Sequence, residues 1–347
     1  MVGTLLSMGS DVLDVQNLNV SFQKNGQQVD IIRDLSLKVG EGEILALVGE
    51  SGSGKSLTAL AIMGLIPQPP GLVNVQSISL NDWDGSRFEM TTLSAEGMRQ
   101  LRGNKITMVF QEPMVSLNPT MTVGAQIAEV LRAHLGKGRR TSRIEAIDLL
   151  EQVGIPDPAT RANSYPHELS GGMRQRAMVA IALSCRPRLL IADEPTTALD
   201  VTVQAQILEL IKGLRDQYGM AVIFITHDLG VVAETADRVV VMYCGEIIEQ
   251  ASTERVLKSP RHPYTGGLLR SKLCLDIASE VATELAPIPG QPPDPAHRPR
   301  GCAFQPRCDF ADPGLCNMNL DLAYIEDGER AIRCHRWEEV AKSLVVL

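Results

Sequence analysis

Short apolar runs recur along the chain, and each has the length of one strand buried on both faces of a sheet. Between these runs lie stretches with the apolar periodicity of helices. Strands that alternate with helices predict an α/β fold built on a mostly parallel sheet, covered on both sides. The predicted strands are Ile44–Val48, Ile106–Phe110, Leu189–Asp193, Val222–Thr226 and Val239–Tyr243, and the clearest predicted helices are Thr141–Val153, Gly171–Cys185 and Val203–Leu214.

Three regions depart from this alternation. Residues 12–48 contain short apolar stretches, among them Val12–Val15 and Leu35–Leu37, and we expect them to be rich in strands. Residues from about 112 to 185 are mainly helical in pattern and predict a separate subdomain. The proline-rich stretch Pro287–Pro299 predicts a boundary or a wrapped linker before the last segment. The sequence shows no internal repeat, so we expect one such α/β unit and not two.

A glycine-rich run follows the first predicted strand directly. It has the pattern G-x-x-x-x-G-K-S, and the good helix formers Leu57–Met63 come after it. In the order strand, glycine loop, helix, backbone N–H groups converge on phosphate oxygens and the helix N-terminus adds its positive end. Lys55 is expected to reach the β- and γ-phosphates, and Ser56 to ligate magnesium. An ordinary glycine-rich turn is the alternative, but this context favours a nucleoside triphosphate site formed by Gly49, Glu50, Ser51, Gly52, Ser53, Gly54, Lys55 and Ser56.

Polar side chains end three other predicted strands. Asp193 ends one of them, where it can hold the magnesium ion through water, and the adjacent Glu194 is the candidate general base. His227 ends another strand and is a candidate sensor of the γ-phosphate. Gln111 follows a third and is placed to meet magnesium or the attacking water. Each residue alone also fits a solvated strand end, but together they predict one hydrolytic site.

A second glycine turn opens the helix predicted from Gly171. The residues Ser170, Gly171 and Gly172 form an anion site by the same argument of helix dipole and free backbone N–H groups. One phosphate loop with two phosphate-binding turns is best explained if the second turn serves a nucleotide held by another subunit. A simple helix cap is the alternative.

Composition limits the classes of protein. The chain has 347 residues, 44% of them hydrophobic, which suggests one large domain with an appendage or two domains. A net charge of −8 argues against a general affinity for nucleic acid. No apolar run approaches the roughly 18 residues of a membrane span, and no signal peptide is recognisable, so we expect a cytosolic chain that meets a membrane only at its surface or through a partner. Residues 1–11 are predicted to be a loose leader, within which Met8 is an alternative start.

The seven cysteines are unevenly spread. Cys185, Cys244 and Cys274 stand alone and are expected to be incidental thiols. The other four crowd into the last segment, which in a cytosolic protein predicts metal binding before disulfides. Their spacing lacks the Cys-x-x-Cys pairs of zinc ribbons, whereas iron–sulfur clusters tolerate varied spacing. An iron–sulfur cluster, a zinc ion and unliganded thiols therefore stay open for Cys302, Cys308, Cys316 and Cys334.

With these motifs in order, residues 12–260 resemble the ATPase subunit of an ABC transporter. Gly49–Ser56 is similar to the Walker A motif of that family, and Leu189–Asp193 to its Walker B motif. The resemblance implies a P-loop NTPase fold of the ABC type: a RecA-like core with an antiparallel β subdomain and an α-helical subdomain at about 112–185. It also implies the catalytic residues Glu194, His227, Lys55 and Gln111, the magnesium ligands Ser56, Gln111 and Asp193, an adenine-stacking Phe22, a nucleotide contact at Leu57, the signature Leu169–Met173, and the D-loop Ala198–Asp200.

Finer features resemble the oligopeptide and dipeptide importers, and most closely the D type of their two ATPase subunits. These features are the extended D-loop Glu194–Gln206, the Q-loop region Val109–Met114 with Ser116–Pro119, and Arg261–Thr265 at the start of a C-terminal extension. Met173 stands where glutamine is commonest in ABC proteins, and this branch tolerates it. The resemblance implies that residues 261–347 form a small extension in which Cys302, Cys308, Cys316 and Cys334 hold a [4Fe–4S] cluster, with Zn²⁺ as the alternative.

The resemblance also implies partners and mechanism. Two ATPase subunits, as a heterodimer, would face head to tail, so that Ser170, Gly171, Gly172 and Asp200 of one contact the ATP and Mg²⁺ bound by the other. Closure and hydrolysis would drive two membrane permeases, which dock near the helical region, while an extracytoplasmic binding protein supplies the solute. The chain would lie on the cytoplasmic face of the inner membrane. The alternatives are an importer of nickel or sugars, and an ABC ATPase outside transport, for which the coiled-coil heptads or doubled ATPase units are missing.

Overall fold

The computed structural model describes residues 11–24, 26–112, 116–196, 200–276, 288–325 and 328–343, the side chains of 272–276 excepted. Within them the chain forms two compact units. The first consists of the segments up to residue 14, 38–43 and 78–225, and the second of 15–37, 44–77 and 226 onward. Several predictions fall outside the described residues: the leader up to Ser10, Pro113, Met114, Thr197, Ala198, Leu199 and Pro287, and the side chain of Cys274.

Three predicted strands form a parallel sheet in the first unit. They are β7 (Ile106–Val109), β8 (Leu189–Asp193) and β9 (Ala221–Thr226), and β8 pairs with both of the others. Every residue of these strands is buried, as expected for apolar runs in a sheet covered on both faces. The predicted strand positions are confirmed to within a residue, and the α/β class follows from them.

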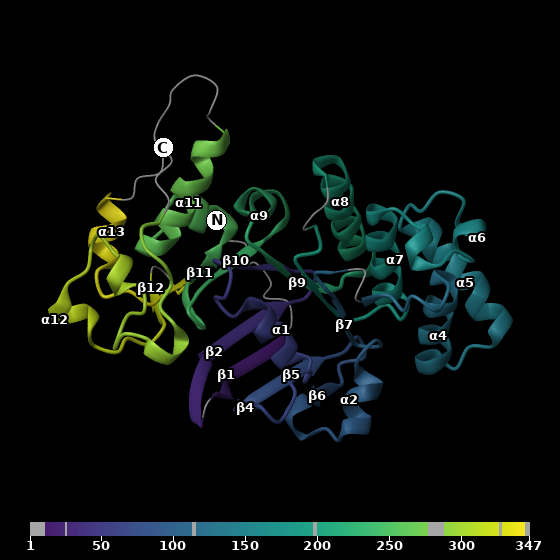
Figure 1. Ribbon diagram of the computed structural model, residues 1–347, viewed down its shortest axis with the longest axis horizontal. Helices are drawn as coiled ribbons and strands as arrows, with labels where there is room; N and C mark the ends of the chain where they lie inside the picture. Colours follow the sequence, from purple (N-terminus) through teal and green to yellow (C-terminus); the bar gives the residue numbers. More distant parts are fainter. Residues whose placement is uncertain are drawn as a thin grey trace, which may run out of the picture. The chain divides into compact units, whose positions relative to one another are not determined.

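Helices α4 (Val123–Leu135), α5 (Arg139–Gln152), α6 (Pro158–Arg161) and α7 (Gly171–Leu183) gather in one part of the first unit (Figure 1). Helix α4 packs on α5 and α7. Gly124 permits a close approach in α4, because a Cβ there would lie 2.6 Å from the carbonyl oxygen of Ala162. The longest helix of the first unit among the described residues, α8 (Val201–Tyr218), follows β8.

A small antiparallel pair, β5 (Ser77–Asn81) with β6 (Arg87–Glu89), followed by helix α2 (Ala95–Leu101), also belongs mainly to the first unit. Arg188 contacts side chains from two other segments of the first unit. Its guanidinium lies 4.0 Å from the ring centroid of Trp83 and 3.1 Å from the carboxylate of Glu41. Strands β5 and β6 and helix α2 were not predicted, because their apolar runs are short.

The second unit combines strands from both ends of the chain. Most of β1 (Asp11–Lys24) and β2 (Gln27–Gly40) lies in it, and β1 pairs antiparallel with β4 (Gly71–Asn74). Strand β3 (Ile44–Val48) pairs in parallel with β10 (Arg238–Tyr243). Antiparallel pairing then adds β11 (Glu246–Ser252), β13 (Arg330–Ile332) and β12 (Ala323–Ile325). The last strands of the chain therefore extend the sheet that carries β3.

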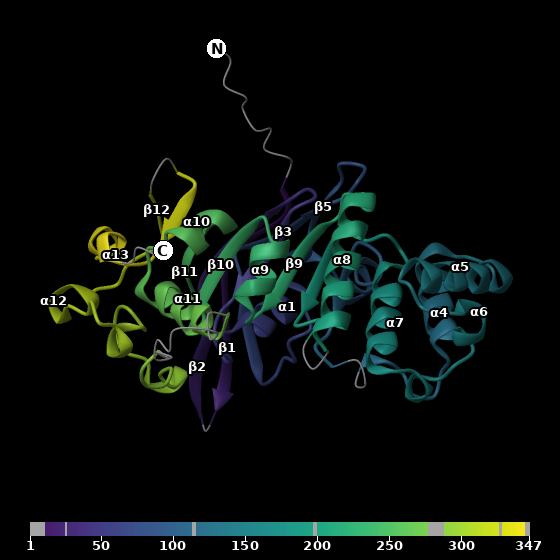
Figure 2. The ribbon, with the colours of Figure 1, turned by 90° about the horizontal axis from the view of Figure 1, so that it is seen from above.

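The described helices of the second unit are α1 (Lys55–Ile62), α9 (Leu229–Thr235), α10 (Thr253–Lys258), α11 (Pro263–Asp276), α12 (Pro313–Cys316) and α13 (Trp337–Ser343). Helix α9 packs on β3 and α10 (Figure 2). One apolar core joins Val48 of β3 and Val241 of β10 to Tyr264 and Phe304 of the C-terminal segment, which comprises the described residues from 261 onward. In the same unit Arg330 and Glu249 form an ion pair, and their side chains are 1% and 0% exposed. The C-terminal segment is therefore part of the core of the second unit.

The turn between β10 and β11 requires glycine. Its two residues, Cys244 and Gly245, have φ of +46° and +79°, as in the two-residue turn that matches the twist of a hairpin. A Cβ on Gly245 would lie 1.7 Å from the carbonyl oxygen of Ile31. A side chain at this position therefore meets both backbone strain and a steric clash.

We expect Gly245→Ala to lower the free energy of unfolding by about 2–4 kcal/mol, since strain and overpacking add. Urea unfolding of the purified chain measures this loss. The matched control is Gly213→Ala on the exposed face of α8, where a Cβ meets nothing within 4 Å. The control is expected to raise stability by about 0.5–1 kcal/mol. Equal stability of the two variants would contradict the structural role of this turn.

Candidate functional site

The predicted phosphate loop connects a buried strand to a helix. Strand β3 ends at Val48, the loop covers residues 49–54, and α1 begins at Lys55. Gly54 caps the helix with φ of +104°, a conformation in which side chains other than that of glycine are strained. Gly49 has no room for a side chain, because a Cβ would lie 2.3 Å from the carbonyl oxygen of Met242. The strand, loop and helix order predicted from the sequence is confirmed.

Lys55 folds back over the loop that precedes it. Its ammonium donates to the carbonyl oxygens of Gly49 at 2.8 Å and Glu50 at 3.0 Å, and to the hydroxyl of Ser53 at 3.4 Å. The side chain is 5% exposed, so the positive charge stands at the centre of the loop and little in contact with water. Ser51, Gly52 and Ser56 are exposed around it, and Leu57 is half-buried. A cationic cradle with exposed backbone is suited to bind phosphate.

The predicted carboxylates lie at the end of β8 in the first unit. Asp193 is the last residue of the strand and is 5% exposed. Glu194 follows with φ of +45°, which is rare for glutamate, and its N–H donates to the carbonyl oxygen of Ile225 at 3.0 Å. The amide of Gln111 donates to a carboxylate oxygen of Glu194 at 2.9 Å. A strained backbone and a hydrogen bond together fix the direction of the Glu194 carboxylate, as a general base requires.

The Ser-Gly-Gly turn caps α7. The hydroxyl of Ser170 accepts from the N–H of Met173 at 3.3 Å, so its role as a helix cap is real. Gly172 lies close to α8, since a Cβ there would be 2.9 Å from Val203. Asp200 caps α8 in the same way, accepting from the N–H of Val203 at 2.9 Å. The signature turn and Asp200 therefore lie at the N-termini of two helices, α7 and α8, that approach each other at Gly172 and Val203.

The other predicted site residues have these positions. His227 follows β9 directly and is exposed, and the next residue, Asp228, caps α9. Phe22 is half-buried on β1, opposite Gly71 of β4. Among the predicted residues, the structure shows direct contact within the phosphate loop and between Gln111 and Glu194.

The surroundings of Glu50 were not predicted from the sequence. This residue occupies a variable position of the loop pattern, yet its carboxylate and its N–H both bind side chains of the C-terminal segment, Arg307 and Tyr264. Tyr264 belongs to the stretch Arg261–Thr265, which was used only as evidence for the family. That stretch did not predict the contact with Glu50.

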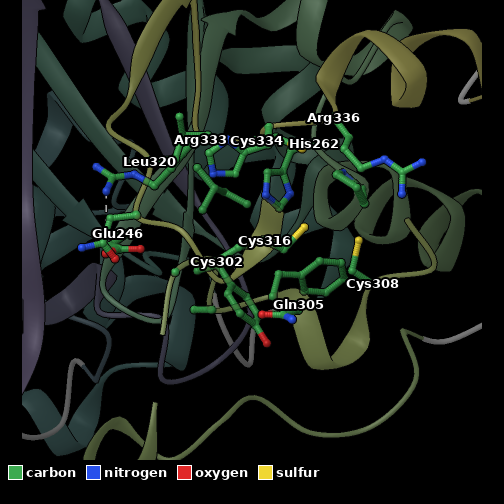
Figure 3. A pocket seen from close by; sticks show the side chains of 18 of the residues that line it. Glu246, His262, Cys302, Gln305, Cys308, Cys316, Leu320, Arg333, Cys334 and Arg336 are labelled. Atoms are coloured by element: carbon green, nitrogen blue, oxygen red, sulfur yellow. Dashed lines mark ion pairs between the residues drawn. The ribbon is translucent and has the colours of Figure 1, made fainter. Parts of the chain in front are cut away.

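The four clustered cysteines line one cavity in the second unit, of about 280 Å³ (Figure 3). Cys302 and Cys308 come from the segment before α12, Cys316 ends α12, and Cys334 follows β13. None of the six cysteines whose side chains are described is in a disulfide. Burial raises the pKa of Cys308 to about 11 and that of Cys334 to about 12, so these groups are neutral thiols at pH 7 unless a cation binds them.

The expected metal group is not supported by the arrangement of these side chains. Among the described residues, no group of three or more His, Cys, Asp or Glu side chains is placed to hold a metal ion. The four cysteines thus line one cavity without being placed around a common metal position.

His262 also lines this cavity, and it has an unusual state. Its Nδ1 accepts from the N–H of Tyr264 at 3.1 Å, so in the neutral ring Nε2 carries the proton. Nε2 is buried without a hydrogen-bond partner in the protein. Burial lowers the pKa of His262 to about 3, which keeps the ring neutral near pH 7. A buried donor without a partner marks a place where a bound group with an acceptor atom would be favourable.

Comparison with known proteins agrees with these features. The family described as ABC transporter matches residues 32–197, and the family described as oligopeptide/dipeptide transporter, C-terminal region, matches residues 248–316. The oligopeptide transport ATP-binding protein OppD of Bacillus subtilis is 51% identical over 300 residues, which are 86% of this chain and 82% of OppD. This chain belongs to the ATP-binding subunits of ABC transporters, in the oligopeptide/dipeptide family.

Two further proteins support membership of this ABC family. The dipeptide transport ATP-binding protein DppD of Escherichia coli is 46% identical over 324 residues, 93% of this chain and 96% of DppD. Among solved structures, a dimeric post-hydrolysis state of the ATP-binding cassette MJ0796, bound to ADP and Pi, matches with a TM-score of 0.59 and 26% identity. The match covers 70% of this chain and 98% of that one. The ABC cassette fold expected from the motifs is confirmed, and the chain is an ABC-type ATPase.

The buried neutral state of His262 predicts a pH dependence of stability in this ABC protein. The pKa of the ring is near 6.5 in the unfolded chain and about 3 in the folded one, so between these values the unfolded chain binds an extra proton. Stability therefore falls as pH is lowered through this window. In His262→Asn, whose amide oxygen can still accept from Tyr264, this slope is expected to decrease by up to ~1.4 kcal/mol per pH unit.

Urea unfolding between pH 6.5 and pH 4.5 measures the slope. His297→Asn is the matched control, because His297 is exposed. The assignment is contradicted if His262→Asn keeps the slope of the unmodified chain.

Proposed function

We propose that this chain is the ATP-hydrolysing subunit of an ABC importer for dipeptides, oligopeptides or similar small solutes. One observation carries the proposal: a phosphate loop with Lys55 at its centre and an oriented carboxylate, Glu194, belong to one chain of this family. The relatives named for oligopeptide and dipeptide transport support a peptide cargo. Import of nickel or sugars is the alternative for the cargo.

Each site residue has a proposed part in hydrolysis. Residues of the loop, with Lys55, bind the phosphates, and Ser56 and Asp193 hold Mg²⁺ together with Gln111. Glu194 accepts a proton from the attacking water, and the hydrogen bond from Gln111 orients it until nucleotide arrives. His227 contacts the γ-phosphate, Phe22 stacks on adenine, and Leu57 provides a further contact with the nucleotide.

We propose that the reaction centre is completed by a second ATPase subunit. Ser170, Gly171, Gly172 and Asp200 would meet the nucleotide of the partner, since both helix N-termini are exposed at their caps. The dimeric state of the matching ATP-binding cassette supports this arrangement. Ser170 would then act both as a cap of α7 and as a phosphate ligand.

The remaining partners follow from the family. None of the helices among the described residues is long and apolar enough to cross a membrane. Two membrane permeases would provide the path for the solute, and an extracytoplasmic binding protein would deliver it. The chain would then act at the cytoplasmic face of the inner membrane, with residues 12–260 as the ATPase domain, the helices within 112–185 toward the permeases, and residues 261–347 as the extension.

We also propose a [4Fe–4S] cluster in the cysteine cavity, with Zn²⁺ as the alternative. The support is the chemistry of the side chains that line the cavity, because thiolates are the usual ligands of iron–sulfur clusters and the unpartnered N–H of His262 could donate to a sulfur atom. When bound, the cluster would cross-link the segment of Cys302 and Cys308 to Cys316 and Cys334. Its role would be structural.

Replacing the proposed base tests the function. Glu194→Gln is expected to lower ATP hydrolysis at least ~100-fold, because the amide cannot accept the proton, while ATP binding persists. Phosphate release and nucleotide titration measure the two properties, and ATP-dependent association with the partner ATPase is expected to increase. Glu209→Gln, on the exposed side of α8, is the control and should hydrolyse normally. Unchanged turnover in Glu194→Gln would exclude this residue as the base.

The cluster is tested by metal content. After anaerobic purification we expect about four iron atoms and matching sulfide per chain, with broad visible absorbance. Cys308→Ser should lower the iron content, whereas Cys185→Ser, outside the cavity, should not. A colourless chain that contains zinc would overturn the cluster in favour of the alternative.

A further inference from the structure

Glu50 of the phosphate loop is bound from two sides by the C-terminal segment. Its carboxylate accepts two hydrogen bonds from the guanidinium of Arg307, at 2.8 Å and 3.0 Å. Its N–H donates to the hydroxyl oxygen of Tyr264 at 2.7 Å. Both partners lie more than 200 residues further along the chain. A bidentate arginine–carboxylate ion pair of this kind is strong and directional.

Arg307 is itself rigidly held. Its side chain is 5% exposed, its Nε donates to the carbonyl oxygen of Pro289 at 2.8 Å, and a further N–H donates to Ile288 at 3.3 Å. Its backbone closes a short turn, because its N–H donates to the carbonyl oxygen of Phe304 at 2.9 Å. The carbonyl oxygens of Pro289 and Ile288 thus hold the guanidinium in the position from which it binds the Glu50 carboxylate.

Tyr264 provides the second fixed point. It is fully buried, and its ring centroid lies 4.7 Å from that of Tyr243 and 5.4 Å from that of Phe304. Its hydroxyl is held at the loop by this aromatic packing, which belongs to the core of the second unit. The Glu50 N–H thus donates to a hydroxyl whose ring is packed in the core.

These contacts reach the phosphate cradle in one step. The carbonyl oxygen of Glu50 accepts from the ammonium of Lys55 at 3.0 Å, so the position of Glu50 sets the position of the lysine charge. Electrostatics adds a second effect. A carboxylate in a phosphate-binding loop repels a triphosphate, and Arg307 neutralises it.

We propose that Arg307 and Tyr264 are positioning residues for the phosphate loop, through which the C-terminal segment sets the affinity for nucleotide. The proposal rests on the proposed function and adds regulation of the same site. The turn that carries Arg307 also carries Cys302 and Cys308, so any change in the cysteine cavity has a short path to the loop.

The test uses the full chain and two measurements: titration with MgADP by calorimetry, and the KM and kcat of ATP hydrolysis. Arg307→Gln leaves the Glu50 carboxylate without its cation, and we expect the dissociation constant for MgADP to rise roughly tenfold. KM should rise by a similar factor and kcat should change little. Tyr264→Phe keeps the ring packing and removes only the acceptor, and a rise of roughly threefold is expected.

A double variant separates positioning from folding. Adding Glu50→Gln to Arg307→Gln removes the unpaired charge, so the double variant should bind MgADP more tightly than Arg307→Gln alone. Loss of a merely structural arginine would not be repaired in this way. The matched control is Arg330→Lys, which changes another buried, paired arginine that binds Glu249, Ser259 and Arg255 and not the loop. It should keep the affinity within about twofold of the unmodified chain.

Three results would overturn the proposal: unchanged affinity in Arg307→Gln and Tyr264→Phe, equal weakening in Arg330→Lys, or no recovery in the double variant. Thermal unfolding of each variant confirms that the folded protein is measured. If the unmodified chain binds no MgADP, the proposed function fails. If the unmodified chain binds MgADP and hydrolyses ATP, and the variants bind MgADP as tightly as it does, only this inference fails and the proposed function stands.

Discussion

The conformation of the six residues between β3 and α1 is the constraint on which the rest of the structure depends. A loop that offers its N–H groups to phosphate cannot satisfy them within itself, so its shape must be imposed by neighbours. Three contacts impose this shape. The carbonyl oxygen of Met242 leaves no space for a side chain at Gly49, and the N–H of Gly245 donates to the carbonyl oxygen of Ser53 at 2.9 Å. The ammonium of Lys55 donates to the carbonyl oxygen of Gly49. The hairpin between β10 and β11 therefore supports the conformation of this loop.

The C-terminal segment contacts this loop at Glu50. Tyr264 and Phe304 pack with β10 residues in a common core, and Arg307 carries that packing to Glu50. The segment that distinguishes the peptide-transporter family is thus joined to the most general feature of nucleotide-binding proteins. Its cysteine cavity and the neutral, buried His262 lie beside the same core. A family-specific extension and a general ATP-binding loop therefore share structural elements.

The sequence predicted the elements whose signal is local. The strands β3 and β8 have the predicted bounds, because short continuous apolar runs are typical of a strand buried on both faces. Helices α5, α7 and α8 were found by periodicity. Strands β12 and β13 were not foreseen, since three residues such as Ala323–Ile325 carry no pattern and gain their conformation from pairing with β11. The expected metal-holding arrangement of the cysteines was not reproduced.

By itself, the sequence determined the phosphate loop, the carboxylates after β8 and the family, since each depends on residues that are neighbours along the chain. Only the tertiary structure decided that Gln111 holds Glu194, that four cysteines and His262 share a cavity, and that Arg307 binds Glu50. Gln111 and Glu194 are 83 positions apart along the chain, and Glu50 and Arg307 are 257 positions apart. The physical reason is that such contacts depend on how the strands and core bring distant segments together, and no local pattern of side chains records that.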